Sequence, residues 1–344
     1  MKLDSIEIRK ELNRLMNEAK AIAKPDKCIL CGKKQSSFCN SHSVPKMILK
    51  NIANNGKVLT ANATIGIEVI DDEKGVNNSG TFNFICRECD KKMFQDYENP
   101  NRLSDLELSD KLLSEIALKD TLLMLSKRNF EKSLYKIMIS NYKVGGLEPL
   151  FDIQNLDTNE YLNAMKLHMG IKKSDVDKYQ IVYKKLLPYT VPFASQTMVA
   201  LDYDLEGVEI NDKFDLSEEN TIENLHIAVF PLEEKTLALV FYHRKNRKYK
   251  KFRNQFNCLS DSKKLELINY WIFKYTEHYY FSPLIKDVIE NNEQLSNLSR
   301  EVGGTPNLGF NSMSEIQEYK TVKEDEIPNL LLAEYSIEKL KEMN

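Results

Sequence analysis

The sequence predicts an α+β protein with a cysteine-bearing N-terminal segment, a helical middle, and a C-terminal part that contains a small antiparallel sheet and helices. Three observations predict this order. Two cysteine pairs lie near the N-terminus, leucines recur at helical spacing after residue 101, and three short segments between residues 196 and 244 are rich in β-branched and aromatic residues. The change of pattern places the helical middle before the sheet.

Composition is that of an ordinary globular chain, since 42% of the 344 residues are hydrophobic and 29% are charged. The net charge is −3, so any contact with nucleic acid has to come from a local basic patch. The N-terminus has no uninterrupted apolar core, and no run reaches roughly 18 apolar residues, so we expect a cytoplasmic protein without a membrane span. In that compartment the six cysteines are better explained as metal ligands or free thiols than as disulfides.

The chain divides into five predicted segments. Apolar side chains in residues 2–23 recur with a period of about 3.6 and stop at "KPDK", which predicts an amphipathic helix. The segments are an N-terminal helix (1–24), a cysteine-bearing module (25–100), a helical region (101–190), an α+β region (191–300) and a polar tail with a short helix (301–344).

Helix and strand signals fill the later segments. Residues 102–140 are leucine-rich at helical spacing, and Ser104 with Glu107 forms a capping box that predicts a helix start. "YKVGGLEPL" predicts a break, and we expect more helix to about residue 186. The expected strands are "QTMVALDYDL", "LHIAVFPL" and "KTLALVFYHR", after which "DSKKLELINYWIFKYTEHYY" returns to helix.

Two C-x-x-C pairs are the strongest motif in the chain. Each pair bends the backbone so that two thiolates face one ion, and two pairs complete a tetrahedral zinc site. Gly32 directly follows the first pair and lets that knuckle turn tightly. Four thiolates leave no open coordination position, so the predicted zinc is structural. The predicted ligands are Cys28, Cys31, Cys86 and Cys89, whereas Cys39 and Cys258 have no partner at ligand spacing.

The cysteine pairs enclose "FCNSHSVPK", in which His42 stands three residues before Pro45. The order is a knuckle, a histidine shortly before a proline, and a second cysteine pair that is followed by a polar residue. This order resembles the HNH (ββα-metal) endonucleases, which are built on a treble-clef zinc fold. The resemblance covers about residues 26–100. It implies a treble-clef module, hydrolysis of phosphodiester bonds, and a catalytic divalent cation in addition to the structural zinc.

The resemblance gives His42 the role of general base. A neutral histidine can take the proton of a water that attacks phosphorus in line with the leaving 3′ oxygen. Mg²⁺ or another divalent cation would offset charge on that oxygen, and Asp90 is the expected ligand. Asn83 is the expected middle residue of the motif, either orienting the histidine or approaching the metal. Ser41 stands where these nucleases often have another metal ligand.

Two alternatives accompany this assignment. A helix starting near Cys89 would put Asp90 and Glu98 on one face but roughly 12 Å apart, at 1.5 Å rise per residue. One ion cannot bind both carboxylates at that separation. We therefore expect Glu98 to pair with a basic residue or to contact the residues that bind the ion without binding it itself. The alternative for His42 is a histidine that caps a turn through a hydrogen bond.

"FYHRKNRKYKKFRNQF" is a candidate nucleic-acid contact. Its cations could follow a phosphate backbone, and the interleaved Tyr242, Tyr249 and Phe252 could stack on bases. The alternative is an exposed hairpin whose tip is simply charged. The candidate cations are Arg244, Lys245, Arg247, Lys248, Lys250, Lys251 and Arg253.

The leading prediction is therefore an HNH-type, metal-dependent endonuclease acting on nucleic acid, DNA in the first instance, with the remainder of the chain used for targeting, regulation or a protein partner. Compact nuclease modules of this kind are common in bacterial defence against phage, which is an analogy to the family. The competing prediction is a non-catalytic zinc module that binds nucleic acid or a protein, with His42 as scaffold. Only the first prediction requires both His42 and Asp90 beside a labile divalent site.

Overall fold

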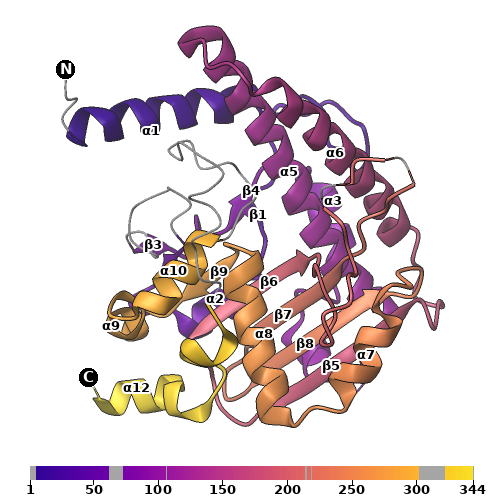
Figure 1. The fold of residues 1–344 in the computed structure, drawn as a ribbon, viewed down its shortest axis with the longest axis vertical. Helices are drawn as coiled ribbons and strands as arrows, with labels where there is room; N and C mark the ends of the chain where they lie inside the picture. The colour runs from indigo at the N-terminus through magenta and orange to yellow at the C-terminus, as the bar shows by residue number, and fades with distance from the viewer. Residues whose placement is uncertain are drawn as a thin grey trace.

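Figure 1 shows the fold as a computed structural model, in which residues 5–61, 73–105, 107–213, 215–217, 219–301 and 322–343 are described. A seven-stranded antiparallel sheet forms the centre. Its strands are β2 (Lys57–Thr60), β3 (Lys74–Gly75), β5 (Tyr179–Leu187), β6 (Phe193–Val199), β7 (Leu225–Pro231), β8 (Thr236–His243) and β9 (Tyr279–Phe281). They lie in the spatial order β3-β2-β9-β6-β7-β8-β5. A second, two-stranded sheet pairs β1 (Ser41–His42) with β4 (Thr81–Phe82).

Helices surround the sheet (Figure 1). The α-helices are α1 (Ser5–Ile22), α2 (Lys46–Ile52), α3 (Arg87–Met93), α4 (Pro100–Leu103), α5 (Asp110–Tyr142), α6 (Glu148–Met169), α7 (Tyr249–Asn257), α8 (Asp261–Tyr275), α9 (Lys286–Glu290), α10 (Glu293–Glu301) and α12 (Ile337–Met343). Short 3₁₀ turns are η1 (Pro283–Ile285), η2 (Glu324–Glu326) and η3 (Ala333–Tyr335). Across the described ranges, none of these helices has the length and apolar character needed to cross a lipid bilayer.

Both faces of the large sheet are buried at its centre. Every residue of β7 and β8 is buried, which explains why their sequences are continuous apolar runs rather than alternating ones. Because successive side chains of a strand point to opposite faces, Ile227 packs into one core with α7 and α8, and Phe230 packs into the other with α5 and the cysteine module. The fold therefore has three layers, with α7 and α8 on one face and α5 on the other (Figure 1).

The cysteine module is built into this sheet. β2 pairs with β9, with Leu59 opposite Phe281 and Thr60 opposite Tyr280. β9 in turn pairs with β6, so a strand from the N-terminal module extends the sheet of the C-terminal part. The two parts share one hydrogen-bonded sheet.

The mixed helix-and-sheet class is confirmed, and so is the helix expected in residues 2–23, which appears as α1. The strands expected in "LHIAVFPL" and "KTLALVFYHR" are confirmed as β7 and β8, whereas the strand expected over 196–205 is confirmed only in its first part, because β6 ends at Val199. The leucine-rich region forms one long helix, α5, and a short one, α4. The prediction that a capping box at Ser104 starts the long helix is wrong. The Ser109 hydroxyl caps α5 instead, because it accepts a hydrogen bond from the Leu112 N–H at 3.2 Å. Ser104 instead ends α4.

Two further helix boundaries are corrected. The prediction of helix to about residue 186 is wrong, because α6 ends at Met169 and the strand β5 occupies Tyr179–Leu187. β5 pairs along its length with β8, and this partner decides its conformation despite two lysines in its sequence. The helix expected over 261–280 ends at Tyr275, and the chain then enters β9.

The described part of the C-terminal segment, 322–343, packs onto the protein. Leu330, Leu331 and Leu340 are buried in the core beneath α8. Asn269 of α8 holds this segment in place, because its amide donates to the Pro328 carbonyl at 3.0 Å and its oxygen accepts from the Leu330 N–H at 3.0 Å. The expected short helix is present as α12, while the "VGGTPNLG" break lies outside the described residues.

Candidate metal centre and adjoining histidine site

Four cysteines meet at one point, as the sequence predicts. The sulfur atoms of Cys28, Cys31, Cys86 and Cys89 all lie within 4.8 Å of one another. The Sγ atoms of Cys31 and Cys86 are 3.9 Å apart. A tetrahedral zinc site with Zn–S bonds of about 2.3 Å would place its sulfurs about 3.8 Å apart, so this cluster could hold a metal ion such as zinc.

Two local structures present these sulfurs. In the first knuckle Gly32 has a φ of +70°, a conformation that glycine adopts without strain, and its N–H donates to the Cys28 carbonyl at 2.8 Å. In the second, Cys86 is the N-cap of α3 and its sulfur accepts from the Cys89 N–H. Burial opposes ionisation of Cys28, but backbone N–H donors outweigh it and bring the pKa of this thiol to about 7.

His42 lies on β1, opposite Thr81 of β4. Its Nε2 is 2.9 Å from the Val76 carbonyl oxygen. A carbonyl can only accept, so Nε2 carries the hydrogen and Nδ1 carries the lone pair. Burial lowers the pKa of His42 below its usual value, partly offset by the bond to Val76, and the charge of Lys119 acts in the same direction as burial. The imidazole is therefore neutral at pH 7, with no described residue hydrogen-bonded to Nδ1.

Packing from the sheet fixes the strand that carries His42. The Tyr97 hydroxyl lies 2.9 Å from the Ser43 carbonyl and 2.5 Å from Oε1 of Gln196 on β6. The Ser43 N–H donates to the Gly80 carbonyl at 2.8 Å. Gly80 has no tolerance for a side chain, because its φ is +62° and an added Cβ would lie 2.1 Å from the Tyr280 hydroxyl.

Asp90 lies on α3 directly after the last cysteine, where its carboxylate is already occupied. Its Oδ1 accepts from the Ser41 hydroxyl at 2.6 Å and from the Lys119 ammonium at 3.0 Å, and its Oδ2 accepts from the Cys39 thiol at 3.2 Å. Burial alone would raise the pKa of Asp90, but the Lys119 charge and the Ser41 hydroxyl lower it below its usual value. The carboxylate is ionised and paired.

Lys119 of α5 is the residue of this site that the sequence argument missed. Its side chain is 0% exposed, and its Nζ lies 3.6 Å from the centroid of the Phe94 ring and 2.9 Å from the Ser41 hydroxyl. A signal was present, because Glu115, Lys119 and Asp120 interrupt an otherwise apolar stretch of α5 and all three are buried. Charged residues in a buried run require partners, and those of Glu115 are the backbone N–H groups of Asp96 and Tyr97.

Glu98 and Asn83 occupy supporting positions. α3 ends at Met93, so Glu98 is not on a continuous helix with Asp90, and the expected separation of two helical turns is wrong. Both carboxylates approach Lys119, with Glu98 Oε1 4.0 Å from its Nζ, so the expected pairing of Glu98 with a basic residue is confirmed. The Asn83 amide donates to the Cys39 carbonyl at 3.0 Å, which ties the strand before Cys86 to the loop before His42.

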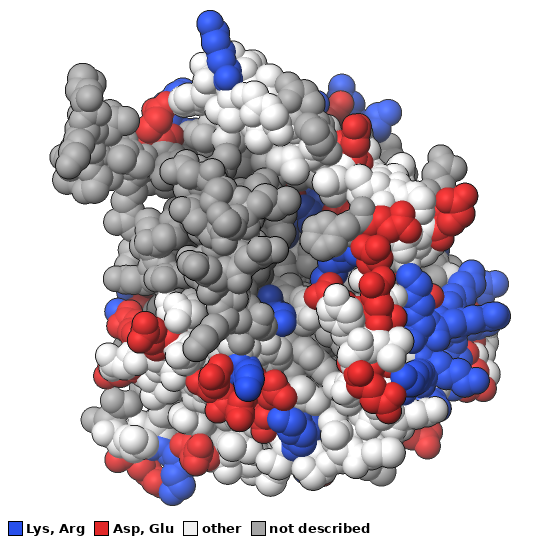
Figure 2. Space-filling view, in the orientation of Figure 1, with Lys and Arg blue, Asp and Glu red and all other residues white. Residues whose placement is uncertain are grey.

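The basic segment forms a turn and then α7. It is therefore not a hairpin, and Figure 2 shows Lys and Arg gathered at the side of the molecule where α7 and the ends of β5 and β8 lie. The prediction that its aromatic residues stack on bases is wrong, because all three are buried in the core. The exposed fractions of Tyr242, Tyr249 and Phe252 are 5%, 0% and 0%. Several of its cations have oxygen partners. Lys251 pairs with Asp204 and Glu206, and the Lys248 ammonium donates to the Thr221 carbonyl.

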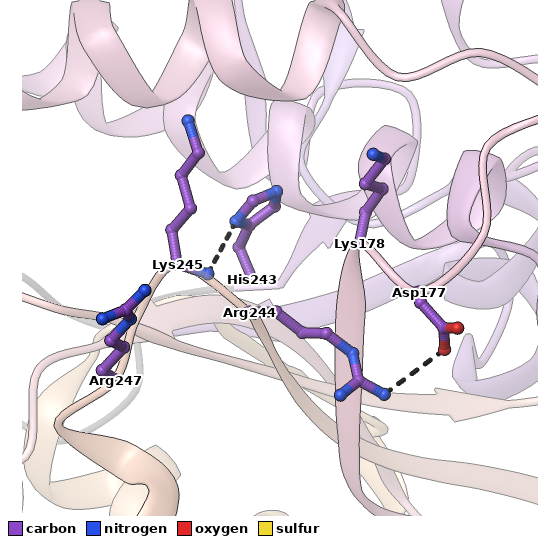
Figure 3. A pocket seen from close by; sticks show the side chains of 6 residues that line it. All are labelled: Asp177, Lys178, His243, Arg244, Lys245 and Arg247. Carbon is purple, nitrogen blue, oxygen red and sulfur yellow. Dashed lines mark hydrogen bonds and ion pairs between the residues drawn. The ribbon is translucent and has the colours of Figure 1, made fainter.

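The turn itself borders a hollow, shown in Figure 3. Arg244, Lys245 and Arg247 line it together with Lys178, which the sequence argument did not connect with them. Strand pairing brings Lys178 to this hollow, because the next residue, Tyr179 of β5, lies opposite His243 of β8. No local sequence pattern predicts that Lys178 lies beside the turn after β8.

Comparisons with known proteins add no further assignment. No protein-family model matches the chain, and no curated protein or solved structure matches it either. The chemistry of the site is therefore inferred from the residues of this chain alone.

Proposed function

We propose that this chain is an HNH-type endonuclease whose catalytic module is the cysteine-stapled N-terminal segment. The observation that carries the proposal is the state of His42, a neutral imidazole whose tautomer is fixed by the Val76 carbonyl. Such a group presents a lone pair at Nδ1 and can act as a general base at neutral pH.

The local topology supports the same proposal. A knuckle with Cys28 and Cys31 precedes β1, β1 pairs with β4, and a second cysteine pair opens α3. This is the strand–strand–helix order expected of a treble-clef ββα module. In the proposed reaction His42 takes a proton from the attacking water, whose oxygen forms a new bond to phosphorus. The bond from phosphorus to the leaving 3′ oxygen breaks, and that oxygen takes a proton from solvent. Lys46 is an exposed cation close enough to influence His42, and in this proposal it contacts the scissile phosphate.

A catalytic divalent cation does not fit the arrangement around Asp90. The Lys119 ammonium already lies against the carboxylate oxygen that would bind such an ion. Among the described residues, the four cysteines are the only group of three or more His, Cys, Asp or Glu side chains close enough to hold a metal. We therefore assign no step to a divalent cation.

The pairing of Asp90 with Lys119 supports the second candidate, a non-catalytic zinc module that binds nucleic acid or a protein partner. With Asp90 paired to Lys119, the site satisfies its own charges, as a structural site does. The two candidates differ in whether His42 is needed for turnover or only for packing.

The test is incubation of the purified chain with plasmid DNA and with RNA in Mg²⁺, Mn²⁺, Ni²⁺ or EDTA. We expect cleavage that falls by about 10²–10⁴-fold in His42→Ala, the range for loss of a general base, and recovers in part with added imidazole. The control is Asn54→Ala, an exposed change in the same module, and zinc content is measured in every protein. Full cleavage by His42→Ala, or none by any protein in any metal, would refute the endonuclease and leave the binding module.

A further inference from the structure

A charged hollow lies where the paired strands β5 and β8 meet the turn that follows β8. Its volume is about 490 Å³, and it is lined by Asp177, Lys178, His243, Arg244, Lys245 and Arg247 (Figure 3). Strand pairing creates it, since the Arg244 N–H donates to the Lys178 carbonyl at 2.8 Å. The two cationic segments are thereby fixed side by side.

Positive charge in this hollow is largely uncompensated. Four of its lining side chains are cationic and one is a carboxylate, in a chain whose net charge is −3. Among the described residues, Asp177 forms an ion pair with Arg244 alone, at 3.4 Å. Within the described ranges, no ion pair is formed by Lys178, Lys245 or Arg247, and all three are exposed. Lys251 of α7 differs, because it is already paired with Asp204 and Glu206.

The turn that carries these cations is held in one shape. The buried His243 ring accepts from the Lys245 N–H at 3.2 Å, and the His243 carbonyl accepts from the Asn246 N–H at 2.8 Å. The Glu223 carboxylate accepts from the backbone N–H groups of Arg247 and Lys248. A turn ordered before binding loses less conformational entropy when a ligand arrives.

We propose that this hollow binds a phosphate group. A phosphate monoester carries a charge of about −1.5 to −2 at neutral pH, which suits a hollow lined by four cations and one carboxylate. Among the described residues that line the hollow there is no Phe, Tyr or Trp, so recognition falls on the phosphate rather than on a base. This binding site does not depend on the proposed endonuclease. The phosphate could belong to a small molecule such as a mononucleotide or to the 5′ end of a nucleic acid.

The experiment uses the full chain in EDTA and isothermal titration with AMP, adenosine, inorganic phosphate, and oligonucleotides with a 5′-phosphate or a 5′-hydroxyl. We expect phosphate-bearing probes to bind and adenosine not to bind. Lys178→Gln, Lys245→Gln and Arg247→Gln should each weaken binding about three- to tenfold, since tenfold corresponds to the loss of one moderate charged contact. Lys136→Gln, an exposed change on α5, is the matched control and should leave binding unchanged.

The results separate the sources of the phosphate and test the site. Binding of AMP or inorganic phosphate assigns a small ligand, whereas binding of the 5′-phosphorylated oligonucleotide alone assigns the end of a nucleic acid. Absence of binding by every phosphate-bearing probe overturns the proposal, as does equal weakening by Lys136→Gln. His42→Ala should bind as the wild type does, so failure of the endonuclease proposal and failure of this one are distinguishable.

Discussion

Replacing Lys119 with methionine tests whether the buried pair beneath His42 holds the module together. The ammonium lies 3.0 Å from Asp90 Oδ1, and the Lys119 side chain is 0% exposed while that of Asp90 is 17% exposed. At an effective dielectric constant of about 20, charges at this distance attract by roughly 5 kcal/mol, most of which offsets the desolvation of the two groups. Loss of one partner of a buried pair typically costs about 3–5 kcal/mol. Because Asp90 keeps some contact with water, we expect Lys119→Met to lower the free energy of unfolding by about 3 kcal/mol.

A double-mutant cycle measures the pair itself. Unfolding in urea is followed by circular dichroism for Lys119→Met, Asp90→Asn and the double variant, with zinc content checked in each. The double variant should be destabilised by about 2 kcal/mol less than the sum of the single changes, because the second substitution removes a charge that the first left unpaired. Lys136→Met, exposed on the same helix, should change stability by less than about 0.5 kcal/mol. Additive single changes, or a Lys119→Met effect as small as that of Lys136→Met, would refute the reasoning.

Three further predictions address the metal centre, pH and the polar network. Cys31→Ser should abolish binding of about one zinc per chain, measured by metal analysis after dialysis, and a variant that retains full zinc would contradict the four-cysteine site. Burial lowers the pKa of His243 to about 4 and that of His278 to about 3, so between pH 6.5 and these values the unfolded state binds more protons than the folded state. Stability is therefore lost as pH falls, by about 2 kcal/mol per histidine between pH 7 and 5, and urea titrations at the two pH values should show a smaller loss for His278→Gln. Tyr97→Phe removes the hydroxyl that meets Gln196 and should destabilise by about 1–3 kcal/mol in the same assay, whereas an unchanged midpoint would show that water replaces it.

Local motifs were predictable where a few neighbouring residues determine the outcome. The cysteine centre is such a case, because each pair folds its own knuckle and only the meeting of the pairs is long-range. The strands β7 and β8 were predictable because their apolar runs have no other stable place than a buried sheet.

Features that depend on distant partners were not predictable. β5 contains lysines and reads as helix until its pairing with β8 is known. Lys178 joins the hollow only because its carbonyl pairs with the Arg244 N–H. Lys119 stands out in the sequence as a cation in an apolar stretch, but its partner Asp90 lies 29 residues away and was not predictable. The stacking role expected of Tyr249 failed for a related reason, because helix α7 turns that ring into the core.

The strand that joins the cysteine module to the sheet has a consequence for how the protein assembles during synthesis. The four cysteines that could hold a metal ion such as zinc are all made once residue 89 has left the ribosome, so a metal centre there could form early. β2 must then wait for β9, whose residues Tyr280 and Phe281 are made far later, and this pairing gives the fold a high contact order. Until that moment β2 presents an unpaired edge, the kind of surface on which nascent chains aggregate. The early metal centre would limit the motion of this edge while translation proceeds, and zinc shortage should therefore appear first as poor recovery of newly made protein.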